Sequence, residues 1–351
     1  MENQNQTPHK RRVRYKGKYP KKFEEKYKEL QPEKYKDTIE HVIQKGNTPA
    51  GMHISIMVKE IIDFLNIQPG EIGFDATLGY GGHTKAMLKC LNGKGHIYAT
   101  DVDPEESDKT KKRLADQGFG EDLLTVKLQN FCTIDEIAKE VGGFDFILAD
   151  LGVSSMQIDN PKRGFSFKVD GPLDLRLNQE AGISAAERLD TITRDELAGM
   201  LYENSDEPYC EELAKAITDE IRKGNRIDTT TKLRQVIEKT LDFLPEKEKK
   251  DTIKKTCQRT FQALRIDVNR EFEVLYEFME KLPDALRPGG RVAILTFHSG
   301  EDKLVKKALK EGYKAGIYSD YAKDVIRPSA QECAQNGRAR STKMRWAVKN
   351  K

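Results

Sequence analysis

The sequence predicts an α/β protein in which a doubly wound parallel sheet is interrupted by a helical insertion. Strand and helix patterns alternate from residue 72 to residue 150 in units of roughly 25 residues, which implies right-handed crossovers between parallel strands. The alternation stops over residues 158–260, where helical patterns follow segments rich in Gly, Pro and Asp. Apolar strand patterns return near residues 291 and 343, so the insertion divides one sheet domain.

Each element of the predicted sheet domain has a local signal. Apolar residues at helical spacing predict a first helix, which Gln68-Pro69-Gly70 ends. Pro104 opens a later helix at a favoured first-turn position, and Pro288-Gly289-Gly290 predicts a turn. The predicted strands are 72–75, 96–101, 123–128, 144–150, 291–297 and 343–349, and the predicted helices are 54–65, 84–91, one from Pro104, 133–141, 261–282 and 301–311.

The composition is that of a soluble protein of about two domains. The 351 residues carry 60 Lys and Arg against 57 Asp and Glu, a net charge of +3, and the apolar runs are far shorter than the roughly 20 residues of a membrane span. The five scattered cysteines and six histidines form no ligand cluster, and the polar N-terminus argues against a secretory signal. We therefore expect a cytoplasmic, metal-independent protein.

The N-terminal segment differs in charge from the rest of the chain. Eight basic residues and no acid lie between Lys10 and Lys22, with Tyr15 and Tyr19 among them. Such a segment is typical of a mobile arm, which either solubilises the protein or binds a polyanion. The predicted organisation is a basic, flexible extension at 1–48, a sheet domain at 49–157 and 261–351, and a helical insertion at 158–260.

The ends of the first two predicted strands carry the signals of a nucleoside site. Ligands of open α/β sheets bind beyond the carboxyl ends of the strands. The first strand runs into Asp75-Ala76-Thr77-Leu78-Gly79-Tyr80-Gly81-Gly82-His83, and a glycine loop before a helix lets a backbone approach a ligand. Asp101 follows about twenty residues later, where a carboxylate suits a ribose diol. The alternatives are a simple turn and a helix N-terminal acid.

The spacing of the loop favours one adenosine cofactor over another. Gly79 and Gly81 fit a dinucleotide fingerprint, but Thr84 stands at its third glycine. The extra Gly82 and the preceding Asp75 resemble an S-adenosylmethionine loop, since that cofactor has no pyrophosphate and its positive charges favour a carboxylate. Phe131, after the third strand, either flanks adenine or belongs to the core.

The end of the fourth strand carries the candidate catalytic groups. Asp150, Ser154 and Ser155 lie in one short segment, and a carboxylate with two hydroxyls is hard to explain by packing. Amino-group methyltransferases hold the reacting nitrogen at this strand end. We expect these residues to accept hydrogen bonds from an amine, with Asp150 either taking the proton or only orienting the nitrogen.

Several longer motifs resemble the bacterial 16S ribosomal RNA cytosine-N(4) methyltransferases. They are residues 150–159 (DLGVSSMQID), 163–167, 170–176, 259–266 with Asn269, 297–302 and 336–341, in the order of that family. The resemblance covers about residues 53–349. It departs from the family pattern at Met156, Gly300, Lys303 and 203–207, and in the lysine-rich extension.

The resemblance implies a fold, a reaction and a cofactor set. The fold is a class I S-adenosylmethionine-dependent methyltransferase sheet with an inserted helical domain, and the reaction methylates a cytosine of the decoding centre. The implied partner is 16S ribosomal RNA in the small subunit, with no membrane and an open oligomeric state. Carried over by position, the cofactor set is Gly81, Gly82, His83, Asp101, Phe131, Asp150 and Gln157.

A second group of residues is expected to face the RNA. Unpaired bases can be splayed out and stacked on aromatic side chains. The candidates are Arg163, Phe165, Phe167 and Arg176 of the insertion, Arg265 and Asn269 on one face of the long helix, and His298, Ser299, Asn336, Arg338 and Arg340 near strand ends. The phenylalanines could instead form the core of the insertion, Arg265 and Asn269 could brace the site, and His298 could be structural. Rival functions are a DNA or small-molecule amino methyltransferase, a non-catalytic RNA-binding assembly factor and an NAD-dependent oxidoreductase.

Overall fold

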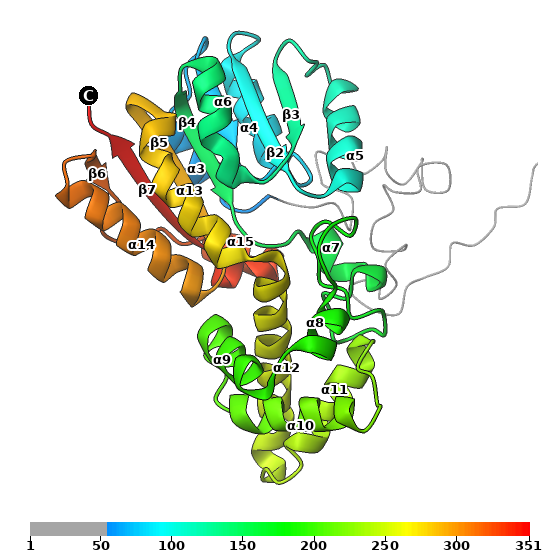
Figure 1. The fold of residues 1–351 in the computed structure, drawn as a ribbon. Coiled ribbons are helices and arrows are strands. Elements are labelled where there is room, and N and C mark those ends of the chain that lie inside the picture. The colour runs from blue at the N-terminus through cyan, green and yellow to red at the C-terminus, as the bar shows by residue number, and fades with distance from the viewer. Residues whose placement is uncertain (1–54) are drawn as a thin grey trace, which may run out of the picture. The chain divides into compact units, whose positions relative to one another are not determined.

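A seven-stranded sheet in the order β3-β2-β1-β4-β5-β7-β6 forms the centre of the fold (Figure 1). The neighbours from β3 to β5 pair in parallel, whereas β7 runs antiparallel to β5 and β6. The order reverses between β1 and β4, which is the switch point of a doubly wound sheet, so the predicted fold class is confirmed. The strands are β1 (Ile72–Asp75), β2 (His96–Asp101), β3 (Leu124–Leu128), β4 (Phe144–Asp150), β5 (Leu286–Thr296), β6 (Tyr318–Tyr321) and β7 (Lys343–Lys349).

The computed structural model describes residues 55–351, which form one unit. The predicted basic extension, including residues 10–22, lies outside the described residues. No helix among residues 55–351 is long and apolar enough to cross a bilayer.

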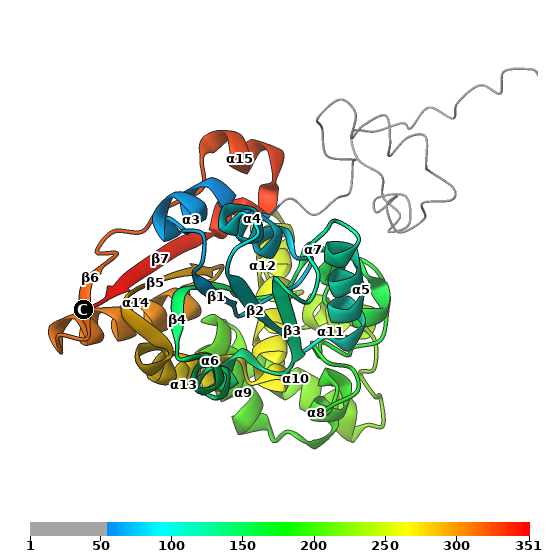
Figure 2. The same cartoon turned by 90° about the horizontal axis from the view of Figure 1, so that it is seen from above.

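Helices cover both faces of the sheet (Figure 2). Ile137, Phe278 and Leu309 belong to the core on one face, and Ile61, Met87 and Leu114 belong to the core on the other. The helices of the first face are α6 (Ile134–Val141), α13 (Glu271–Ala285) and α14 (Ser299–Lys314), and those of the second are α3 (Val58–Leu65), α4 (Gly82–Leu91) and α5 (Pro104–Ala115).

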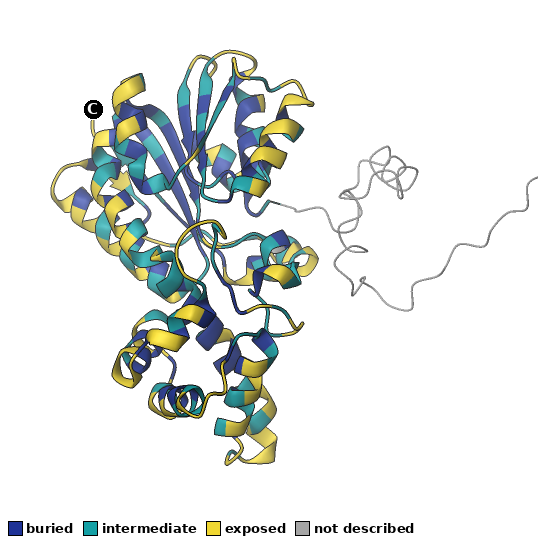
Figure 3. Cartoon of the chain, turned by 45° about the vertical axis from the view of Figure 1, so that its right-hand side comes forward, coloured by how far each residue is buried: buried dark blue, intermediate teal, exposed yellow. Residues whose placement is uncertain are grey.

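The central strands are buried on both sides, which explains their predominantly apolar sequences (Figure 3). In β4, Phe146 and Leu148 pack into one core while Ile147 and Ala149 pack into the other. Gly73 in β1 makes room for this packing, because a Cβ there would lie 2.0 Å from the ring of Phe146.

The insertion has a hydrophobic core of its own. Leu197, Leu213 and Leu233 meet Phe261 and Leu264 there. Capping boxes begin α8 and α9, so the local sequence specifies where these helices start. The elements are α7 (Ser155–Asp159), η3 (Pro161–Arg163), α8 (Ala185–Thr191), α9 (Arg194–Ser205), α10 (Cys210–Arg222), α11 (Thr230–Thr240) and α12 (Glu246–Asn269), and η2 (Phe131–Thr133), α15 (Ala330–Gln335) and η4 (Gly337–Ser341) lie elsewhere.

The structure corrects two predicted elements. The single helix predicted at 261–282 is wrong, because α12 begins at Glu246 and a left-handed Arg270 (φ 51°) separates it from α13. The turn predicted at 288–290 is part of β5, which absorbs it as an irregularity in its pairing with β4 between Phe144 and Phe146. The predicted domain boundary at residue 260 also falls inside α12.

Candidate active site

Three acidic residues meet at the carboxyl edge of the central strands. Asp75, Asp101 and Asp150 are the last residues of β1, β2 and β4. β1 pairs in parallel with both other strands, so these ends lie at one edge of the sheet. The sequence analysis placed the three acids at the ends of predicted parallel strands, and the strand order of the structure brings those ends together.

The loop after β1 is shaped by its glycines. Gly79 and Gly81 have φ values of 47° and 76°, in the left-handed region that disfavours other residues. A Cβ on Gly81 would lie 2.7 Å from the methyl carbon of Thr110, whose hydroxyl donates to the Gly79 carbonyl at 2.6 Å. Gly82 begins α4 and faces the Ser55 side chain. The loop is therefore held against α5 while its backbone runs past the strand ends.

Asp75 anchors this loop to the interior of the protein. Its side chain is almost fully buried, and it accepts hydrogen bonds from the Thr84 hydroxyl at 2.6 Å and from the Thr77 amide at 3.1 Å. Burial raises the pKa of Asp75. Because both carboxylate oxygens are engaged inside the protein, the geometry favours an anchoring role over the direct cofactor contact that the sequence predicted.

Asp101 is placed to hold a diol. Its two carboxylate oxygens accept the amides of Gly79 at 2.8 Å and Asp103 at 2.9 Å. Each oxygen keeps a further lone pair for a ligand hydroxyl. Burial raises the pKa of Asp101 to about 6, so the carboxylate is mostly ionised at neutral pH.

Asp150 carries an unpartnered oxygen at the end of β4. Its backbone amide donates to the Thr77 hydroxyl at 2.8 Å, and its Oδ2 lies 3.4 Å from Nδ1 of His83. The other ring nitrogen of His83 lies 2.8 Å from the Ile56 carbonyl. Oδ1 of Asp150 is buried with no hydrogen-bond partner among the described residues. A buried carboxylate oxygen without a donor is costly, so this atom is a candidate acceptor for a substrate.

His83 fixes the orientation of Asp150. Burial alone would lower the pKa of His83, but the Asp150 carboxylate and the Ile56 carbonyl outweigh burial, and the pKa is raised. The ring is therefore a donor held between two acceptors. This places the predicted cofactor residue His83 beside the predicted catalytic residue.

The segment after β4 turns back toward β2. Ser154 caps α7, and its hydroxyl and amide form a capping box with Gln157. The side-chain amide of Gln157 also donates to Asp103 at 3.1 Å. Ser155 is the first residue of α7. The hydroxyl of Ser154 thus caps the start of α7, and an additional contact with an amine stays a prediction.

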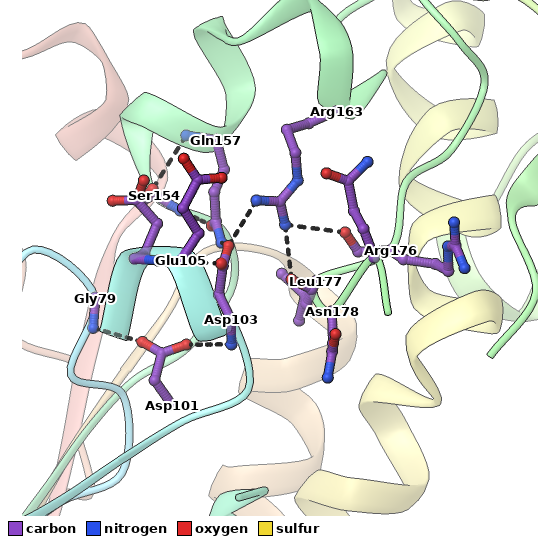
Figure 4. Close-up of polar contacts among 12 residues, drawn as sticks. Gly79, Asp101, Asp103, Glu105, Ser154, Gln157, Arg163, Arg176, Leu177 and Asn178 are labelled. Atoms are coloured by element: carbon purple, nitrogen blue, oxygen red, sulfur yellow. Dashed lines mark hydrogen bonds and ion pairs between the residues drawn. The ribbon is translucent and has the colours of Figure 1, made fainter. Parts of the chain in front are cut away.

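Asp103, which the sequence did not single out, is the centre of a buried hydrogen-bond network (Figure 4). It caps α5 by accepting from the Glu106 amide, and its Oδ2 lies 2.6 Å from a guanidinium nitrogen of Arg163. The remaining guanidinium contacts of Arg163 are the backbone carbonyls of Arg176 and Leu177, at 3.1 and 2.6 Å. We call the four residues Asp103, Gln157, Arg163 and Leu177 the Asp103 network. The Asp-Pro pair at the start of α5 was its only local signal.

Three of the residues predicted to face the RNA make their contacts inside the protein. Arg163 is buried, with a side-chain exposure of 7%, and Arg176 forms a two-pronged ion pair with Asp174. Asn269 accepts from the Leu177 amide at 2.7 Å and donates to the Leu175 carbonyl at 2.8 Å. These contacts favour positioning roles for the three residues and leave a direct RNA contact untested.

The predicted aromatic platforms are half-buried. The ring of Phe167 lies 5.8 Å from that of Phe261, and Phe165 packs against the same core of the insertion. The ring of Phe131 stacks edge-on against Phe278 at 5.2 Å, beside the core of the sheet domain. The packing alternative therefore has support for all three, and stacking on a base or on adenine stays a prediction.

The end of β5 carries a compact charged cluster. Arg265 holds both carboxylate oxygens of Glu271 at 2.8 Å, and His298 lies 3.1 Å from Glu301. His298 is also the N-cap of α14, so its structural alternative is favoured. Glu271, His298 and Glu301 could group around a cation, but the Arg265 guanidinium already neutralises Glu271. Ser299 is exposed beside this cluster.

The three late candidates lie between α15 and β7. Asn336 caps η4, and Arg338 forms an ion pair with Asp159 of α7 at 2.9 Å. Arg340 is exposed. Arg338 thus joins the C-terminal segment to the helix that follows Asp150.

The geometry suits an adenosine cofactor and an amine substrate. A glycine loop, a carboxylate for a ribose diol and an unpartnered carboxylate oxygen lie at neighbouring strand ends. Such a set can bind a nucleoside and accept hydrogen bonds from an amine placed beside it.

Comparisons with known proteins agree with this geometry. The MraW methylase family matches residues 50–350. A ribosomal RNA small subunit methyltransferase H 1 of Agathobacter rectalis is 88% identical over 97% of this chain and 98% of its own length. Proteins named ribosomal RNA small subunit methyltransferase H 1 of Lachnoclostridium phytofermentans and H 2 of Alkaliphilus metalliredigens are 70% and 62% identical, covering 99% and 97% of this chain and 95% and 97% of their own lengths.

Proposed function

Because the chain belongs to the MraW methylase family, we propose that it methylates ribosomal RNA of the small subunit with S-adenosylmethionine. The full-length identity of 88% to a protein named for that activity carries the proposal. The motif resemblance extends it to the N(4) amine of a cytosine in the decoding centre of 16S RNA. The fold and the cofactor site agree with methyl transfer.

The residues of the chain fit the cofactor. Asp101 would accept hydrogen bonds from the ribose hydroxyls, and the glycine loop at residues 79–82 would lie beside the rest of the cofactor. Gln157 orders the start of α7 beside this site through the Asp103 network. S-adenosylmethionine supplies a methyl group that its sulfonium charge has already activated.

Asp150 orients the nucleophile in this mechanism. The amine of cytosine is a poor nucleophile, because its lone pair is delocalised into the ring. An N–H that donates to the free Oδ1 of Asp150 fixes the direction of the nitrogen, while His83 holds Oδ2. Fixing this geometry lowers the activation free energy of methyl transfer without a metal ion. The proton of the methylated amine leaves through the same oxygen or to water.

The test is methyl transfer to small subunits from a strain that lacks this activity. Labelled S-adenosylmethionine, nuclease digestion and mass spectrometry identify the product nucleoside and its position. Asp150→Asn should lower kcat by at least about 100-fold and leave cofactor Kd within about threefold. The reason is that the asparagine side chain has one acceptor oxygen in place of two and carries no negative charge. Asp116→Asn, an exposed acid after α5, is the matched control.

Three results would contradict parts of the proposal. Label on another nucleotide would refute the decoding-centre cytosine while keeping the enzyme class. An absence of label in small subunits, with cofactor binding confirmed by calorimetry, would favour a binding or assembly role. Full turnover by Asp150→Asn would remove Asp150 from the mechanism.

A further inference from the structure

One face of α14 carries lysines of a single sign. Lys303, Lys306, Lys307, Lys310 and Lys314 are all exposed and repeat at intervals of three and four residues. Val305, Leu309 and Gly312 on the opposite face are buried against the sheet. The five lysines, which we call the α14 lysine face, therefore have no part in packing the helix.

The positive charge of this face is almost uncompensated. Glu311 is the acid among these lysines, 4.0 Å from Lys307, with both side chains largely exposed. The other four lysines have no ion-pair partner in residues 55–351. In α5, by contrast, Lys109 pairs with Glu105 and Lys111 pairs with Glu121. An exposed single-sign cluster raises the local concentration of an oppositely charged partner.

The α14 lysine face begins beside the active site. α14 starts directly after β5, whose Leu295 pairs with Asp150, and Figure 1 shows it on the outside of the sheet. From Lys303 to Lys314 the helix rises about 16 Å. The lysines and Glu311 surround a shallow hollow of about 360 Å³. The face is thus long enough for several consecutive phosphates of one strand.

We propose that the α14 lysine face binds the phosphate backbone of the ribosomal RNA that flanks the methylated base. This inference rests on the proposed function and assigns a binding surface that the catalytic site does not include. Lysine is a compact point charge on a flexible stem, which suits phosphate contacts that position RNA without reading its sequence. Asp150 and the face then engage one RNA, the base at the strand ends and the backbone along α14.

The experiment measures the salt dependence of RNA binding. The test variant is Lys306→Gln, Lys310→Gln and Lys314→Gln, all unpaired lysines, and the matched control is Lys89→Gln, Lys94→Gln and Lys112→Gln, exposed lysines away from α14. Binding of each full-length variant to small subunits and to deproteinised 16S RNA is followed by fluorescence anisotropy between 50 and 250 mM salt. Cofactor Kd is measured in parallel.

The proposal expects a smaller salt slope for the test variant. Losing three phosphate contacts reduces the slope of log Kd against log salt by about 2 to 3 and weakens binding roughly tenfold or more at low salt. The control keeps the wild-type slope, and both variants keep the wild-type cofactor Kd. Equal slopes for the two variants would overturn the proposal.

Two further outcomes separate this inference from the proposed function. A reduced slope with intact subunits but not with deproteinised RNA would mean that an acidic protein is the partner, which also overturns the proposal. A reduced slope on RNA in an enzyme that transfers no methyl group would support the surface while refuting the proposed reaction.

Discussion

Replacing Asp103 with alanine should destabilise the protein through the loss of one buried ion pair. The carboxylate accepts from the Glu106 amide, the Gln157 side chain and the Arg163 guanidinium. The side chains of Asp103 and Arg163 are only 3% and 7% exposed. After the substitution, water has little access to the remaining guanidinium, whose Nε already lacks a partner among the described residues.

The expected loss of stability follows from these contacts. Removing one partner of a buried ion pair costs about 3 to 5 kcal/mol, because the other charge stays buried. Losing the helix cap adds about 1 kcal/mol. The predicted loss is therefore about 4 to 6 kcal/mol, which is a large part of the 5 to 15 kcal/mol typical of a folded protein.

A double-mutant cycle in urea tests this magnitude. Asp103→Ala, Arg163→Met and the double variant are unfolded, and their free energies of unfolding are compared. The double variant should be at least about 2 kcal/mol more stable than the sum of the single losses predicts, because it leaves no unpaired charge. Asp103→Asn keeps an acceptor for the cap and separates the loss of charge from the loss of the cap. Single losses below about 1 kcal/mol, or losses that add within about 0.5 kcal/mol, would refute this reasoning.

Three other predictions concern the cofactor site and the insertion. Burial raises the pKa of Asp101 to about 6, so the cofactor Kd should rise by up to tenfold per pH unit below that value as the carboxylate is protonated. Calorimetry should find that Asp101→Asn binds the cofactor more weakly than the wild type, with a Kd that does not change over the same pH range. Gly81→Ala should weaken cofactor binding and lower Tm, since its φ of 76° and its contact with Thr110 exclude a Cβ; a wild-type Kd and Tm would contradict the loop geometry. Asn269→Ala should cost about 1 to 3 kcal/mol of stability and increase hydrogen exchange in residues 175–177, whose amide and carbonyl it holds; unchanged exchange would contradict that role.

The acids at the strand ends could be predicted because their signals are local. A buried parallel strand such as Phe144–Asp150 is apolar from Phe146 to Ala149, and its last polar residue marks the carboxyl edge. The order of such strands then brings Asp75, Asp101 and Asp150 together without further information. The glycines at 79 and 81 were equally readable, because their left-handed backbone leaves few other residues possible.

The remaining features depend on contacts between distant segments. Asp103 looks like an ordinary helix cap, and nothing near it indicates a guanidinium from a residue 60 positions later. The break between α12 and α13 falls at Arg270, a residue with no preference for the left-handed backbone it adopts. β6 is short and carries two polar residues among its four, so its sequence does not differ from that of a loop.

Because of helix α12, the insertion cannot be separated from the sheet domain as an independent part. Its 24 residues span about 36 Å, and Cys257, Phe261 and Leu264 complete the core of the insertion while its last residue, Asn269, holds the loop beside the Asp103 network. An excised insertion that stops before α12 would lack one wall of its core. Recombining the insertion with the sheet of another methyltransferase therefore requires transplanting α12 as well, with its register preserved at both ends.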